Sequence, residues 1–130
     1  MSKPHKVLVI DDDPSFVTAM TPVLESRGCR VEAAYSKIEA PQMIERFKPD
    51  LIVLDIMMET RSDGFDLCRE LKHDPELKEI PILAVSAIKS VIGMKFSPKT
   101  DGEYFPADDF VEKPVSPENL LERVEKLLKV

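Results

Sequence analysis

The chain has 130 residues, of which 43% are hydrophobic and 32% charged, and its net charge at pH 7 is −6. This length predicts one domain over residues 1–130, and the negative charge argues against direct nucleic acid binding, because phosphate recognition needs a basic patch. With no apolar run of membrane-spanning length, no signal-peptide pattern and only two cysteines, we expect no membrane insertion and a cytoplasmic location.

The first half of the chain alternates apolar runs with helix patterns. Asp13 and Pro14 are typical of a helix start, as N-cap and first residue, and Gly28 is typical of a helix end. Pro22 should kink or loosen that helix, and Pro41 marks where the regular part of the next one begins. The expected elements are strands at 6–10 and 30–34 and helices at 14–28 and 36–47.

The second half repeats this alternation. A loop through Asp63 and Gly64 precedes a helix that ends near Pro75, and Ser116 or Pro117 begins the last helix. The expected elements are strands at 51–54, 80–85 and 109–112 and helices at 65–74 and 116–128. Apolar strands alternating with helices predict an α/β fold, with a doubly wound parallel sheet covered on both faces.

In such sheets the ligand site lies beyond the carboxyl ends of the strands. Five polar residues stand at predicted strand ends and should therefore face one crevice: Asp11, Asp12, Asp55, Ser86 and Lys113. Adjacent carboxylates after a buried strand repel one another unless a cation compensates them. Mg²⁺ prefers such oxygen ligands, whereas Asp13 is explained by helix capping alone.

A lysine ammonium and a serine hydroxyl beside the acids provide the groups used in phosphoryl transfer. A carboxylate can itself be the nucleophile and form an acyl phosphate. Asp55 is the best candidate, because it stands alone at the end of the strand expected to be most central.

The stretches VLVIDDDP, LIVLDIMM followed by DGFDL, ILAVSA and DDFVEKP occur in this order, and together they resemble response-regulator receiver domains. The resemblance implies a flavodoxin-like five-stranded parallel sheet with the order 2-1-3-4-5. It also implies that Asp55 accepts a phosphoryl group and that Asp12 and Asp55 ligate Mg²⁺. Asp11 would act on the metal mainly through water, and Met57 would offer its backbone carbonyl.

The same resemblance assigns further roles. Ser86 and Lys113 would hold the phosphoryl oxygens, Ser86 and Phe110 would form the switch, and Lys113-Pro114 would be a cis peptide bond. The phosphate would come from a sensor histidine kinase or a phosphotransfer protein, and a change of shape would signal to a downstream protein target. The chain would then catalyse only its own phosphorylation and dephosphorylation.

Two segments depart from the family pattern. The loop MMETRSDG after Asp55 has Glu59 where the family usually has proline, and it is one residue longer. Residues 88–107 contain Gly93, Pro98, Gly102 and Pro106, which leave room for only about two helical turns. The fourth helix is therefore expected to be shortened or rebuilt.

Two other functions remain open at this point. One is a receiver-like binding module that no longer takes phosphate. The other is a phosphohydrolase of the haloacid-dehalogenase type, whose motifs Asp11-x-Asp13, Ser86 and Lys113 imitate. The hydrolase hypothesis leaves Asp55 without a role.

Overall fold

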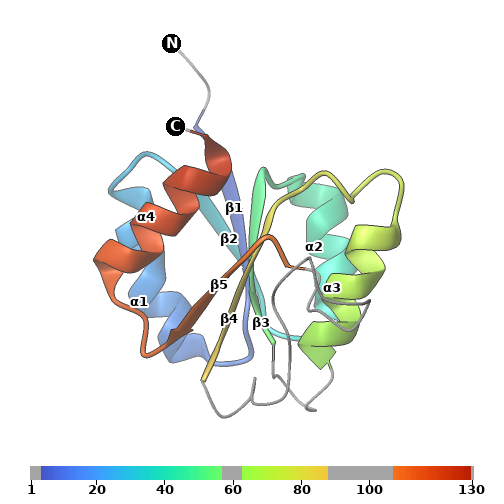
Figure 1. Cartoon of the computed structure of the whole chain (residues 1–130), viewed down its shortest axis with the longest axis horizontal. Helices are drawn as coiled ribbons and strands as arrows, with labels where there is room; N and C mark the ends of the chain where they lie inside the picture. The colour runs from blue at the N-terminus through green and yellow to red at the C-terminus, as the bar shows by residue number, and fades with distance from the viewer. Residues whose placement is uncertain (1–3, 57–62, 88–106, 130) are drawn as a thin grey trace.

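The computed structural model describes residues 4–56, 63–87 and 107–129. They form a five-stranded parallel sheet in the order β2-β1-β3-β4-β5, with helices on both faces (Figure 1). The strands are β1 Lys6–Ile10, β2 Arg30–Ala34, β3 Leu51–Asp55, β4 Ile82–Ala87 and β5 Asp109–Lys113. The helices are α1 Pro14–Glu25, α2 Glu39–Phe47, α3 Asp63–His73 and α4 Pro117–Leu128. The predicted doubly wound sheet and its strand order are confirmed.

Local sequence signals set the ends of two helices. The Asp13 carboxylate caps α1 by accepting a hydrogen bond from the Ser15 backbone N–H at 2.9 Å. Gly28 follows α1 with a φ of 82°, in the left-handed region that glycine adopts without strain. The Ser116 hydroxyl likewise caps α4. The helix α1 continues through Pro22 as a single element.

Alternate residues of the strands supply two separate cores. Val7 and Val9 of β1 pack on the side covered by α1 and α4, whereas Leu8 and Ile10 pack on the side covered by α2 and α3. Figure 1 shows the two helix pairs on opposite sides of the sheet. Burial on both faces explains why the strands read as continuous apolar runs in the sequence.

Several predicted boundaries differ from the structure, most of them by one to three residues. Helix α2 begins at Glu39, two residues before Pro41, because a proline in the first turn costs no intrahelical hydrogen bond. Strand β4 begins at Ile82 rather than at residue 80, whose backbone N–H donates to a preceding turn. Asp63 and Gly64, predicted as loop, form the first turn of α3.

The Met57 carbonyl falls in residues 57–62, outside the described part of the chain. The predicted shortened or rebuilt helix, which would precede β5, falls in residues 88–106, also outside it. Among the helices of the described part, none combines the length and the apolar character needed to cross a bilayer.

Candidate functional site

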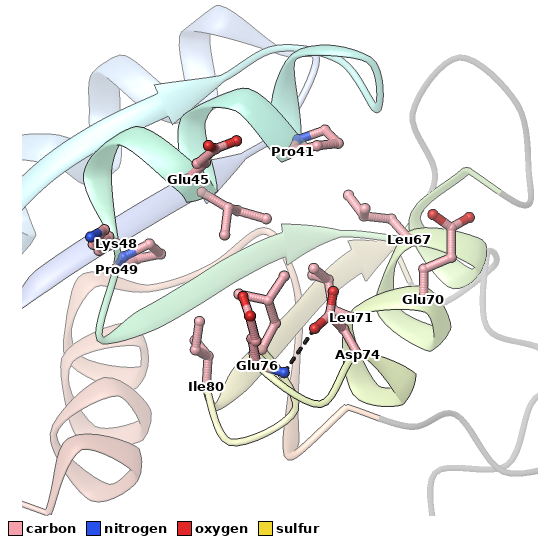
Figure 2. A pocket seen from close by; sticks show the side chains of 12 residues that line it. Pro41, Glu45, Lys48, Pro49, Leu67, Glu70, Leu71, Asp74, Glu76 and Ile80 are labelled. Atoms are coloured by element: carbon pink, nitrogen blue, oxygen red, sulfur yellow. Dashed lines mark hydrogen bonds between the residues drawn. The ribbon is translucent and has the colours of Figure 1, made fainter.

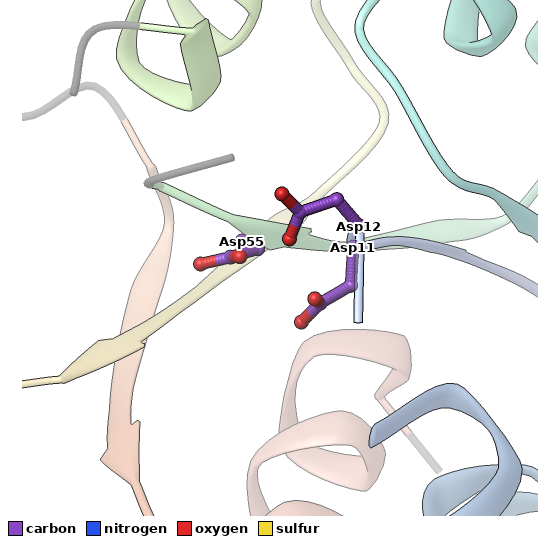
Figure 3. A group of neighbouring side chains, drawn as sticks. All are labelled: Asp11, Asp12 and Asp55. Carbon is purple, nitrogen blue, oxygen red and sulfur yellow. The ribbon is translucent and has the colours of Figure 1, made fainter. Parts of the chain in front are cut away.

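Three carboxylates meet at the carboxyl edge of the sheet, as the sequence predicts. Ile10 of β1 pairs with Leu54 of β3, so the next residues, Asp11 and Asp55, come side by side. Asp12 follows on the same edge. One carboxylate oxygen from each of the three aspartates lies within 4.8 Å of the others (Figure 3).

Asp11 and Asp55 are almost entirely buried, at 1% and 5% exposure, whereas Asp12 is exposed. Burial raises the pKa of Asp11 above its ordinary value. The backbone N–H of Asp13 and the ammonium of Lys113 oppose this shift in pKa, and the nearby charge of Asp12 adds to it. Burial is thus the largest influence on the Asp11 carboxyl group, and it disfavours the charged form.

Lys113, the last residue of β5, is the cation opposite these acids. Its Nζ lies 3.0 Å from Asp11 Oδ2 and 3.9 Å from Asp55 Oδ2. The same ammonium lies over the ring of Phe16, 4.6 Å from its centre. Sequence reasoning did not single out Phe16. Its place in the first turn of the helix that follows Asp11–Asp13 is the signal that could have placed it near these acids.

Gly64 lets α3 begin directly against the end of β3. Its backbone N–H donates to the Ile56 carbonyl at 2.8 Å. A Cβ at this position would collide with the carbonyl oxygens of Asp55 and Ile56. The Asp-Gly pair was predicted to form a turn, but its glycine is needed for close packing of α3 beside Asp55.

The remaining predicted residues are placed as follows. Ser86 lies in β4 opposite Glu112 of β5, and its side chain is outside the described part. Phe110 is half-buried and packs against the core on the α2 and α3 side. Lys113-Pro114 is a cis peptide bond, as predicted.

The Asp13 carboxylate is exposed and caps α1, which argues against a hydrolase that uses it in catalysis.

A cleft of about 730 Å³ lies between α2 and α3 (Figure 2). Ile44, Leu67 and Leu71 are among its apolar lining residues, and Glu45 and Glu70 are among its acidic ones. It shares no lining residue with the carboxylate edge, so the two features are distinct.

Comparisons with known families and curated proteins give matches along most of the chain. The family model described as the response regulator receiver domain matches residues 7–125. The response regulator MprA of Mycobacterium ulcerans is 37% identical over 124 residues, covering 95% of this chain and 50% of MprA. The DNA-binding dual master transcriptional regulator RpaA of Synechocystis is 34% identical, covering 95% of this chain and 49% of RpaA. The chain thus spans about half the length of these relatives.

Solved structures share the fold. A putative response regulator from Chloroflexus aurantiacus superposes with a TM-score of 0.83 at 32% identity, covering 98% of this chain and 100% of that chain. The receiver domain of the histidine kinase PA1611 from Pseudomonas aeruginosa, described with a magnesium ion in its active site cleft, gives a TM-score of 0.78. It is 22% identical and covers 98% of this chain and 99% of that chain, a likeness that shows the fold alone.

Proposed function

The chain belongs to the response regulator receiver domain family, and we propose that it is a Mg²⁺-dependent phosphoacceptor in which Asp55 takes the phosphoryl group. The observation that carries this proposal is the position of Asp55. It ends the central strand, is 5% exposed, and has Asp11, Asp12 and Lys113 beside it. Membership of this family leaves the hydrolase alternative without support.

The transfer needs a nucleophile and positive charge near the phosphoryl oxygens. A carboxylate oxygen of Asp55 attacks the phosphorus and forms a P–O bond, while the bond from phosphorus to the donor breaks and its electron pair leaves with the donor. The Lys113 ammonium, 3.9 Å from Asp55 Oδ2, donates to the incoming phosphoryl oxygens. Ser86, on the neighbouring strand β4, is proposed to donate its hydroxyl to the same oxygens.

The carboxylates have the chemistry of a Mg²⁺ site. Asp11 Oδ1 already accepts the Asp13 N–H at 2.9 Å, and Oδ2 accepts from Lys113. These contacts support a role for Asp11 through water. Asp12 and Asp55 are proposed as direct protein ligands, together with the Met57 carbonyl, as in the family pattern. When bound, the ion supplies positive charge that offsets the carboxylates and the phosphoryl group.

A sensor histidine kinase or a phosphotransfer protein is proposed as the phosphate donor, and an unidentified protein as the target of the signal. Ser86 and Phe110 are proposed to carry the change of shape, since both lie in adjacent strands β4 and β5. RpaA is described as DNA-binding, but it is about twice as long as this chain. The net charge of −6 supports the proposal that these 130 residues, as one receiver unit in the cytoplasm, do not bind nucleic acid directly.

The first experiment is incubation with acetyl phosphate and Mg²⁺, followed by intact-mass measurement. The wild-type protein is expected to gain one acid-stable, base-labile phosphoryl group, and Asp55→Asn none. Asp13→Asn is the matched control, because asparagine also caps helices and Asp13 already has a structural role. It should be labelled like the wild type.

Labelling of Asp55→Asn at the wild-type rate would refute the assignment of Asp55. A wild-type protein that melts cooperatively but takes up no phosphate from acetyl phosphate or from phosphorylated kinases would instead support the receiver-like binding module.

A further inference from the structure

The Lys113 ammonium has an aromatic partner in addition to its carboxylates. Nζ lies 3.0 Å from Asp11, 3.9 Å from Asp55 and 4.6 Å from the centre of the Phe16 ring. A cation within about 6 Å of a ring centre is attracted by the negative potential of the ring face. We propose that Phe16 is a positioning residue, whose ring holds the Lys113 ammonium at the carboxylate edge.

The position of Phe16 is fixed from two directions. It lies in the first turn of α1, whose start is set by the Asp13 cap and by Pro14. Phe16 is half-buried and packs against the core between the sheet and the pair α1 and α4. A ring held in this way presents its face to Lys113 without a large loss of side-chain freedom.

The ring matters because Asp11, whose Oδ2 lies 3.0 Å from Lys113 Nζ, also belongs to the proposed metal site. A divalent cation at this edge would repel the ammonium and offset part of the attraction that the carboxylates exert on it. The ring of Phe16 offers no oxygen ligand, so its attraction for the ammonium persists when a metal is bound. The consequence for phosphorylation, that Lys113 stays close to Asp55, rests on the function proposed above.

A role in packing alone makes a different prediction from a cation–π contact. Fluorine atoms on the ring withdraw electron density from its face and change its shape little. A series with one, two and three fluorines at position 16 therefore weakens the contact in steps and leaves the packing in place. Phe16→Leu removes the ring face altogether, and Phe16→Trp restores one.

The first measurement is NMR of the metal-free protein. Protons above a ring face are shifted upfield by the ring current, so the ε-methylene protons of Lys113 should lie upfield of those of lysines that contact no ring. The shift should disappear in Phe16→Leu. This readout does not depend on phosphorylation, so it tests the contact even if Asp55 takes no phosphate.

The second measurement is the rate of labelling by acetyl phosphate with Mg²⁺ present. We expect the rate to fall with each fluorine and to reach a loss of about three- to tenfold in the trifluorinated protein. Phe16→Leu should lose at least as much, and Phe16→Trp should stay close to the wild type. Melting temperatures across the series check that the fold is retained.

Phe47 provides the matched control. Lys6 and Arg30 lie over its ring at 5.7 and 5.8 Å, and it packs at the end of α2. The same fluorines at position 47 weaken contacts of the same kind and should leave the labelling rate unchanged.

Two results would overturn the proposal. One is an unshifted Lys113 ε-methylene signal in the wild-type protein. The other is a fluorinated series at position 16 that is labelled at the wild-type rate while Phe16→Leu is labelled slowly, which would assign Phe16 to packing. Failure of the wild type itself to be labelled would refute the proposed function and leave the decision on Phe16 to the NMR shift.

Discussion

At the amino edge of the sheet Lys72 pairs with Asp108, and at the carboxyl edge Lys113 pairs with Asp11. The amino-edge pair is saturated with hydrogen bonds. Lys72 Nζ lies 2.7 Å from Asp108 Oδ2 and also donates to the carbonyls of Lys78 and Ile80. Asp108 Oδ2 in turn accepts the Ile82 N–H at 2.8 Å. One cation and one anion are matched, and the pair ties α3 to the starts of β4 and β5.

At the carboxyl edge, the described residues place Lys113 beside a cluster of three carboxylates. Lys113 is closest to Asp11, more distant from Asp55, and partly over an aromatic ring. Two of these carboxylates are buried, so their repulsion is weakly screened by water. In the described part of the chain, the structural ion pair matches its charges, whereas the proposed phosphoryl site has more carboxylates than ammonium groups, an excess that a metal ion can offset.

The largest expected difference between the two edges is their response to Mg²⁺. Saturating Mg²⁺ should raise the free energy of unfolding by about 1–3 kcal/mol, because a ligand that binds only the folded state stabilises it by mass action. Asp12→Ala should lose this increment, and Asp108→Asn should retain it. Urea unfolding with Mg²⁺ and with EDTA measures both. A wild-type stability that is indifferent to Mg²⁺ would count against a metal site.

The next difference is the sign of the change in the free energy of unfolding when one carboxylate at each edge is neutralised in the metal-free protein. Asp108→Asn should lower the free energy of unfolding by about 1 kcal/mol, because it removes the charge that pairs with Lys72. Asp12→Asn, the same chemical change at the other edge, should raise it by about 0.5 kcal/mol, because it relieves repulsion between carboxylates. Urea unfolding at low salt is the measurement. Changes of the same sign in both variants would show that the charge excess has no energetic effect.

The smallest expected effect is a pH dependence at Asp11. Burial raises its pKa in the folded state above the ordinary value of 3.8, so the folded state binds this proton more readily than the unfolded state. Stability from this group is therefore gained as pH falls from neutral through the raised pKa towards 3.8, and lost as pH rises. The wild type should gain stability relative to Asp11→Asn over that window in EDTA, as measured by urea unfolding. Asp13→Asn is the control, and a parallel pH profile for wild type and Asp11→Asn would contradict the expectation.

Local sequence signals predicted the elements that carry the site. The runs before Asp11 and Asp55 are apolar on both faces because both faces are covered, so the strands could be placed without a structure. The Asp13 cap and Pro14 fixed the start of α1 in the same way. The resemblance to receiver domains supplied the strand order, and the structure has that order.

Contacts between distant segments were harder to predict. Asp63 and Gly64 read as a loop because Asp-Gly favours turns, yet both lie in α3, where Gly64 approaches the carbonyls of Asp55 and Ile56 closely. The saturation of Lys72 by carbonyls of the following turn also left no mark in the sequence pattern. In both cases the partner is a backbone carbonyl, which every residue possesses.

The sequence by itself determined that acidic residues follow two apolar strands and that a lysine ends a later one. Apolar runs and helix-capping residues are patterns of neighbours along the chain, so they can be recognised without the fold. Only the tertiary structure decided that Lys113 contacts Asp11 more closely than Asp55, and that Phe16 lies beside the same ammonium. Hydrogen bonds between parallel strands are the same for all side chains, so the distances across the sheet arise only when strands and helices pack together.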